Sequence, residues 1–152
     1  MASPKNDPTA IDPDRLIALY GSLRDERLRR ELALAGRLRR LGRFRLDGIL
    51  YDLGPYPALA PGKGVVHGEL FEILDSRALP SMDAYEEFDP GRPPEFSVYR
   101  RERWRLAEPD LECWIYVYNR PVRGLPRVLG GDWLAQRRRR LPRRVLDPFG
   151  NN

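Results

Sequence analysis

The sequence has few of the residues that form covalent or metal cross-links. Its 152 residues include one cysteine, Cys113, so an intramolecular disulfide is excluded. The single histidine, His67, has no second histidine with which to build a transition-metal site. Cys113 lies in an apolar run, which favours a buried core residue over a nucleophile. We therefore expect no metal centre.

Long apolar runs are also missing. No run approaches the roughly 20 residues that a membrane helix needs, and the N-terminus lacks the charged-then-apolar order of a secretory signal. A chain of 152 residues, 41% of them hydrophobic, is sufficient for one core. We predict a cytoplasmic protein with a disordered leader (1–14), one domain (15–135) and a basic C-terminal tail (136–152).

Positive charge is in excess and is unevenly distributed. The net charge is +5, from 27 basic and 22 acidic residues, and nearly every basic residue is arginine. Residues 21–50 hold nine arginines against four acids, and the tail from Leu134 holds six against one. Arginine makes bidentate contacts with phosphate and carboxylate groups. A solvated surface is the favoured interpretation of these clusters, and a nucleic-acid partner is the alternative.

Fifteen prolines and thirteen glycines are scattered along the chain, which is typical of turns between short elements. Hydrophobic periodicity predicts two short helices, over 24–35 and 79–88. Extended segments are expected over 16–20, 37–60, 65–74, 96–106 and 111–118. The last of these is apolar on both faces and therefore belongs in the centre of a sheet. The predicted fold is α+β, a small mixed or antiparallel β-barrel with short flanking helices.

The segment Tyr20-Gly21-Ser22-Leu23 is the first candidate for a binding site. It joins a buried strand to a helix, where glycine permits close backbone approach and the following N–H groups point toward a bound anion. A substrate carboxylate is a suitable ligand. The alternative is that Gly21 and Ser22 only turn the chain and cap the helix.

Glu86 is the candidate catalytic carboxylate. On a helical wheel Leu79, Met82 and Tyr85 form the apolar side, and Glu86 points within about 40° of its centre. Asp83 points roughly 100° away and Glu87 roughly 140° away, so both are expected to face water. Burial raises the pKa of a carboxyl group toward the range of a general base. The alternatives are a misphased helix or a Glu86 that only pairs with an arginine.

Tyr99 and Tyr116 lie on two neighbouring predicted strands. Buried tyrosine hydroxyls seek partners and can orient a polar ligand. Packing alone is the alternative role for both.

Six segments, in this order, resemble motifs of the γ-glutamylcyclotransferase-like family, which includes AIG2-like proteins. They are Ala18–Arg24 (ALYGSLR), Gly48–Leu59, Val66–Phe71 (VHGELF), Met82–Glu86 (MDAYE), Ser97–Arg101 (SVYRR) and Cys113–Asn119 (CWIYVYN). The similarity spans about residues 16–134. One departure is Glu87, because many relatives have glycine after the glutamate.

The resemblance implies a cofactor-free reaction on a small γ-glutamyl substrate. The α-amine of the substrate attacks its own γ-amide carbonyl, releasing 5-oxoproline and an amine. Carried over by motif, Glu86 is the general acid/base, and Tyr20, Gly21, Ser22 and Leu23 form the pocket, with Tyr99 and Tyr116 as further contacts. The alternative function is a non-catalytic module of the same fold that binds a small ligand.

Overall fold

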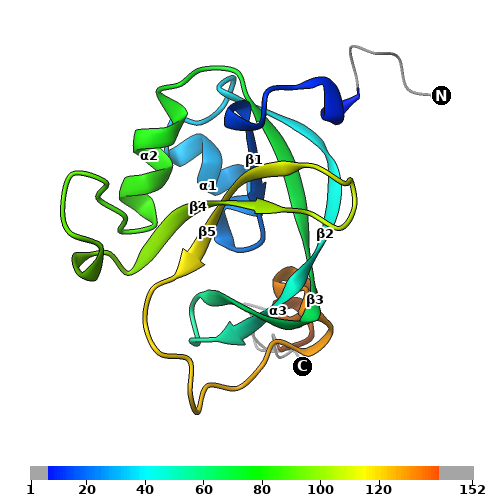
Figure 1. Ribbon diagram of the computed structural model, residues 1–152, viewed down its shortest axis with the longest axis vertical. Coiled ribbons are helices and arrows are strands. Elements are labelled where there is room, and N and C mark those ends of the chain that lie inside the picture. Colours follow the sequence, from blue (N-terminus) through cyan, green and yellow to red (C-terminus); the bar gives the residue numbers. More distant parts are fainter. Residues whose placement is uncertain (1–6, 141–152) are drawn as a thin grey trace, which may run out of the picture.

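A five-stranded mixed sheet forms the centre of the protein in the computed structural model, which describes residues 7–140 (Figure 1). The strands are β1 (Leu16–Leu19), β2 (Leu38–Asp52), β3 (Pro57–Ile73), β4 (Tyr99–Arg105) and β5 (Glu112–Tyr118). Their order is β2-β3-β1-β5-β4, with β1 and β5 parallel and the other neighbours antiparallel. All four residues of β1 are buried, as its unbroken apolar run predicts for a central strand.

The two longest strands, β2 and β3, form a bent hairpin. Its register shifts between Arg40 and Gly42 and again after Asp47, where residues 61–64 of β3 lie opposite Gly48. Such bulges bend a strand and increase its twist. The far half of the hairpin accordingly turns away from the near half in the lower part of Figure 1.

Apolar clusters cover both faces of the sheet, because residues of β1 alternate between them. Leu16 and Ala18 belong to one cluster, which includes Trp133 at the start of α3 (Trp133–Arg140). Ile17 and Leu19 belong to the other, which α1 (Glu26–Glu31) and α2 (Ala78–Tyr85) cover. The end of α2 is thereby placed beside the sheet.

The mixed sheet and helices confirm the α+β class, but the sheet is open. Within residues 7–140, β2 and β4 are its two edges, and no ladder joins them. An isolated bridge links β2 to the β4–β5 turn, where the Arg45 N–H donates to the Glu108 carbonyl at 2.8 Å. The expected barrel is therefore an open sheet, with this single bridge between β2 and the β4–β5 turn.

The helices differ in length and number from the prediction. α1 begins after Asp25, whose side chain caps it, and ends before Ala33, which is left-handed at φ 58°. The predicted helix 24–35 is therefore too long, because α1 ends at Glu31, four residues before Ala35. α3 was not predicted, since its run of arginines hides the few residues that pack.

The ends of the described chain are more ordered than the sequence suggests. Residues 8–10 and 13–15 form 3-10 turns, and the Trp114 indole N–H donates to the Asp14 carbonyl at 3.1 Å. The expected disorder is thus wrong for residues 7–14, while 1–6 lie outside the described residues. α3 crosses the boundary placed at 135, and Gln136 is buried, so the tail does not begin there. Residues 141–152 also lie outside the described part.

Candidate active site

Glu86 lies at the C-terminal end of α2 and is partly buried. The helix stops here because Glu87 is left-handed, at φ 54°. The Phe88 N–H donates to the Asp83 carbonyl at 2.9 Å, and the Glu87 N–H to the Ala84 carbonyl at 3.2 Å. This is the hydrogen-bond pattern of a Schellman cap, whose left-handed position favours glycine. The departure at Glu87 therefore sits at the one residue of this cap where glycine is preferred.

Burial, and after it the negative charge of Asp83, raises the pKa of Glu86 from 4.5 to about 8. A carboxyl group with this pKa exchanges protons near neutral pH, as a general acid/base requires. Glu87 is exposed and is not among the causes of the shift. The carboxylate whose charge raises the pKa of Glu86 is therefore that of Asp83, and not that of the neighbouring Glu87.

Four tyrosines surround Glu86. Burial raises the pKa of each of their hydroxyls, and the charge of Glu86 raises it further, so all lie within electrostatic reach of the carboxylate. They are Tyr20, Tyr85, Tyr99 and Tyr116. The structure thus brings together three of the tyrosines that the sequence singles out and adds Tyr85.

The hydroxyls of the three buried tyrosines donate to protein acceptors. Tyr20 donates to the Tyr116 carbonyl at 2.5 Å, and Tyr99 to the Pro57 carbonyl at 2.7 Å. Tyr116 donates to Asp83 Oδ1 at 2.7 Å. These bonds tie the end of β1 to β5, the start of β4 to the start of β3, and β5 to α2, so they fix the walls around Glu86.

The Tyr20–Leu23 turn follows β1 directly and reaches the same place. A Cβ at Gly21 would lie 3.0 Å from Pro57 Cγ, so a side chain there would press on the proline ring. Ser22 hydrogen-bonds the Tyr85 hydroxyl, which places the turn against the last turn of α2. Within the described chain, the first N–H group that donates a hydrogen bond inside this 3-10 turn is that of Arg24. The N–H groups of Ser22 and Leu23 come before it and donate no hydrogen bond inside the turn.

Arg24, the residue after the Tyr20–Leu23 turn, links it to β3 and to the residue before α3. Its side chain is buried, and its Nη1 donates to Asp132 Oδ1 at 3.0 Å. Its Nε lies 3.5 Å from Glu69 of β3. Asp132 also accepts from the Ala135 N–H at 3.2 Å at the start of α3. The first turn of α3 is therefore connected to the candidate site.

The helical wheel predicted that Asp83 faces water, and the structure shows it buried instead. Its side chain is 8% exposed and is paired with Arg101 of β4. The wheel considered only apolar neighbours, whereas the flank of α2 that carries Asp83 is covered by polar side chains of β4 and β5. Tyr56, to which sequence reasoning assigned no role, lies within electrostatic reach of both Tyr85 and Tyr99. Tyr56 is 49% exposed.

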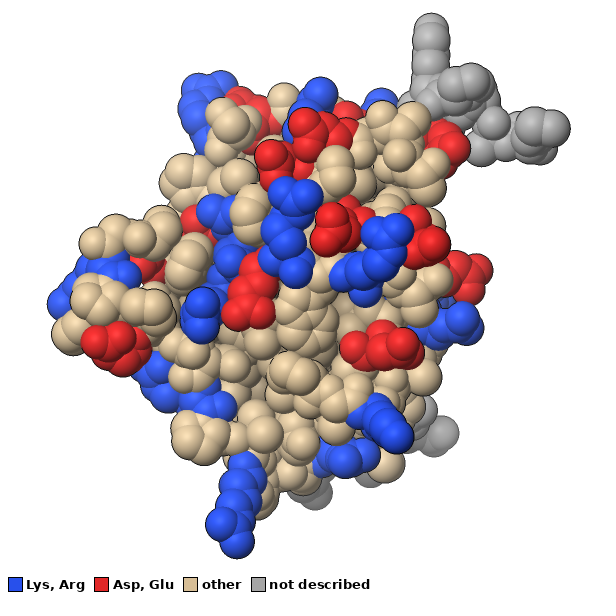
Figure 2. All heavy atoms as spheres, in the orientation of Figure 1, with Lys and Arg blue, Asp and Glu red and all other residues tan. Residues whose placement is uncertain are grey.

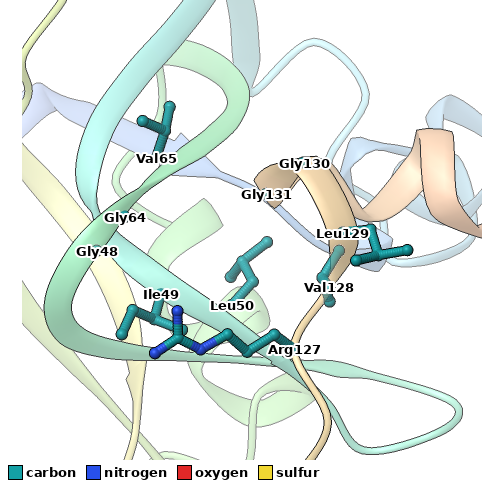
Figure 3. Close-up of a pocket in the computed structure, with 10 residues that line it drawn as sticks. All are labelled: Gly48, Ile49, Leu50, Gly64, Val65, Arg127, Val128, Leu129, Gly130 and Gly131. Carbon is teal, nitrogen blue, oxygen red and sulfur yellow. The ribbon is translucent and has the colours of Figure 1, made fainter.

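Two surface depressions of the described chain have linings that do not include Glu86. Figure 3 shows one of about 300 Å³ between the β2–β3 hairpin and residues 127–131, where Arg127 extends toward Ile49. Its lining has no carboxylate or nucleophile. Another, of about 540 Å³, lies beside the end of α2, and its lining includes the carboxylates of Asp83, Glu87 and Asp89. Neither lining includes Glu86.

The arginines of residues 21–50 are largely neutralised. Eight of the nine lie in ion pairs with acidic side chains. The ninth, Arg29, lies over the Phe71 ring at 4.8 Å. Figure 2 shows basic and acidic side chains interspersed over the upper part of the face. This pairing favours a solvated surface over a nucleic-acid site for this cluster.

Other expectations concern Cys113, metals and membranes. Cys113 is buried, and burial raises the pKa of its thiol to about 12. Among residues 7–140 no cluster of three or more His, Cys, Asp or Glu side chains is arranged to hold a metal ion. In the same part of the chain, none of the helices has the length and apolar character to cross a membrane.

Comparisons with known proteins agree on one family. The model of the family described as "Gamma-glutamyl cyclotransferase, AIG2-like" matches residues 17–135. The gamma-glutamylcyclotransferase family protein YtfP of Escherichia coli is 39% identical over 119 residues, covering 78% of this chain and 95% of YtfP. A putative gamma-glutamylcyclotransferase of Vibrio cholerae is 33% identical over 120 residues, covering 78% and 94%. The solution structure of E. coli YtfP has a TM-score of 0.60 at 36% identity, covering 80% and 98%.

Proposed function

The chain belongs to the AIG2-like γ-glutamylcyclotransferase family, and from this premise we propose that it cleaves a γ-glutamyl amide by cyclisation. The products are 5-oxoproline and the released amine. The observation that carries the proposal is Glu86, a partly buried carboxyl group with a pKa raised to about 8 beside the Tyr20–Leu23 turn. We expect the reaction to take place in the cytoplasm.

The reaction needs one group that accepts and then donates a proton. Glu86 takes a proton from the α-ammonium group of the substrate, and the resulting amine attacks the γ-carbonyl carbon. The new C–N bond closes the five-membered ring, and Glu86 gives its proton to the leaving nitrogen as the old amide C–N bond breaks. The ring nitrogen then gives up its second proton to Glu86, which passes it to the released amine, so the lactam is neutral, the amine leaves as ammonium and the carboxylate is restored. Attack within one molecule avoids the entropy cost of bringing two reactants together.

The pKa of Glu86 suits this exchange. An α-ammonium group ordinarily has a pKa of roughly 8, and general-base catalysis is most effective when the pKa of the base lies near the working pH. A glutamate with its ordinary pKa of 4.5 would be a poor acceptor for this proton. Burial against the sheet therefore supports the assignment of Glu86.

The Tyr20–Leu23 turn is proposed to hold the substrate. The N–H groups of Ser22 and Leu23 precede the first bond of the 3-10 turn and suit a carboxylate or a developing oxyanion. Gly21 lets the backbone approach closely. The rings of Tyr99 and Tyr116, held by their hydrogen bonds, are proposed to form walls of the pocket.

The proposal is tested by measuring 5-oxoproline release from a panel of γ-glutamyl amino acids, amines and isopeptides. Glu86→Gln keeps the side-chain shape and should lower the rate by roughly 10²–10⁴-fold. Glu87→Gln is the matched control, because it removes the neighbouring, exposed carboxylate, and it should retain the rate. Full activity in folded Glu86→Gln would refute the role of Glu86. Thermal stabilisation of the wild type by panel compounds, without product from any, would favour the binding module instead.

A further inference from the structure

Asp83 lies one turn before Glu86, on the same face of α2, and its carboxylate is held by two strands of the sheet. Oδ1 accepts from Arg101 Nε at 2.9 Å and from the Tyr116 hydroxyl at 2.7 Å, and Oδ2 accepts from Arg101 Nη2 at 3.2 Å. Arg101 and Tyr116 are directly opposite each other on β4 and β5. The two donors therefore reach Asp83 from paired positions of one ladder.

The side chains of this cluster are largely removed from water. The side chains of Asp83 and Arg101 are 8% and 14% exposed. The guanidinium of Arg101 lies over the Trp114 ring, 4.4 Å from its centroid, and 5.9 Å from that of Phe88. Burying a carboxylate is costly unless it is paired and hydrogen-bonded, and Asp83 has both kinds of partner. The two parallel hydrogen bonds from Arg101 to Asp83 form a fork, and this fork fixes both the position and the orientation of the helix end that carries Glu86.

We propose that Asp83 is a positioning residue for Glu86: clamped by Arg101 and Tyr116, it fixes the last turn of α2, which carries Glu86, and places a negative charge one helical turn before it. Its role in catalysis rests on the proposed function, whereas its effect on the proton of Glu86 does not.

The groups around Glu86 support this assignment. They are Tyr20 after β1, Asp83 and Tyr85 on α2, Tyr99 and Arg101 on β4, and Tyr116 on β5. Burial raises the pKa of the tyrosines, so they stay neutral at neutral pH. Arg101 is committed to Asp83. After burial, the charge of Asp83 is the remaining cause that raises the pKa of Glu86.

The test is a titration of the Glu86 carboxyl carbon by NMR, with the pH profile of kcat/KM as a second readout. Asp83→Asn keeps the size of the side chain and an oxygen acceptor but removes the charge. We expect the pKa of Glu86 and the acid limb of the profile to move to lower pH. Glu72→Gln is the matched control, because Glu72 is another buried carboxylate paired with arginines, on β3. Glu72→Gln should leave the pKa of Glu86 and the acid limb of the profile unchanged, even where it lowers the stability of the fold.

Unchanged titration of Glu86 in folded Asp83→Asn would overturn the inference, as would an equal displacement in Glu72→Gln. If Asp83→Asn does not fold, Arg101→Lys keeps both charges and loses the fork. Glu86 should then still titrate well above its ordinary range, while kcat falls roughly 10- to 100-fold with less change in KM. A return of Glu86 to the ordinary range in this variant would overturn the inference. The titration needs no turnover, so absence of 5-oxoproline would refute the proposed function alone.

Discussion

Glu86 should destabilise the fold at alkaline pH, and Glu86→Gln should relieve this effect. Burial, and then Asp83, raises the pKa of the folded-state carboxyl from 4.5 to about 8. Between these values the folded state binds more protons than the unfolded state, so the free energy of unfolding falls as pH rises. Each pKa unit is worth 1.36 kcal/mol, so the whole interval is worth roughly 5 kcal/mol. Glu86 keeps some contact with solvent, so screening lowers the expected effect to about 2–4 kcal/mol.

The assay is urea unfolding of the wild type and Glu86→Gln at pH 5, 7 and 9. The advantage of the variant should grow by about 2–4 kcal/mol between pH 5 and pH 9, because every other titrating group is common to both proteins. Glu87→Gln should show no such growth, since its carboxylate is exposed. A stability difference between wild type and Glu86→Gln that stays constant over this range would refute the buried, proton-holding state of Glu86.

Other expectations concern the rest of the fold. Glu87→Gly should raise the free energy of unfolding by about 1 kcal/mol, because residue 87 is left-handed; an unchanged or lower value in urea unfolding would count against this cap. Gln136→Leu removes hydrogen bonds to Asp52 and from the Leu129 N–H and should cost about 1–3 kcal/mol in the same assay; no loss would contradict the packing of α3. Cys113 should resist thiol reagents at pH 8 until the protein unfolds, because burial raises its pKa to about 12; rapid reaction of the native protein would show an accessible thiol.

Elements with a strong local pattern could be predicted from the sequence. β1 and β5 are apolar on both faces, and such strands have few places other than the centre of a sheet. The antiparallel pair β4 and β5 falls within the two neighbouring extended segments expected over 96–106 and 111–118. The inward direction expected for Glu86 needed only the helical period, because Met82, four residues before it, is fully buried.

Features that depend on tertiary contacts could not be predicted. Asp83 is polar and off the apolar stripe, and its partner Arg101 comes from a strand 18 residues further on. Tyr56 joins the site only because the bent β2–β3 hairpin brings its turn toward Tyr99. α3 could not be predicted because its arginines leave no apolar periodicity. Its start is held in place by two buried side chains, those of Trp133 and Gln136.

The central claim, that Glu86 is the proton acceptor of a γ-glutamyl cyclisation, is tested most directly by 5-oxoproline release over pH 6–9. Wild type and Glu86→Gln would be compared with the best substrate of the panel. The account predicts that kcat/KM of the wild type rises with pH through a limb near 8, the pKa of Glu86, and that the variant loses roughly 10²–10⁴-fold in rate. A wild-type rate with no such limb, or a folded variant that releases 5-oxoproline at the wild-type rate, would contradict it.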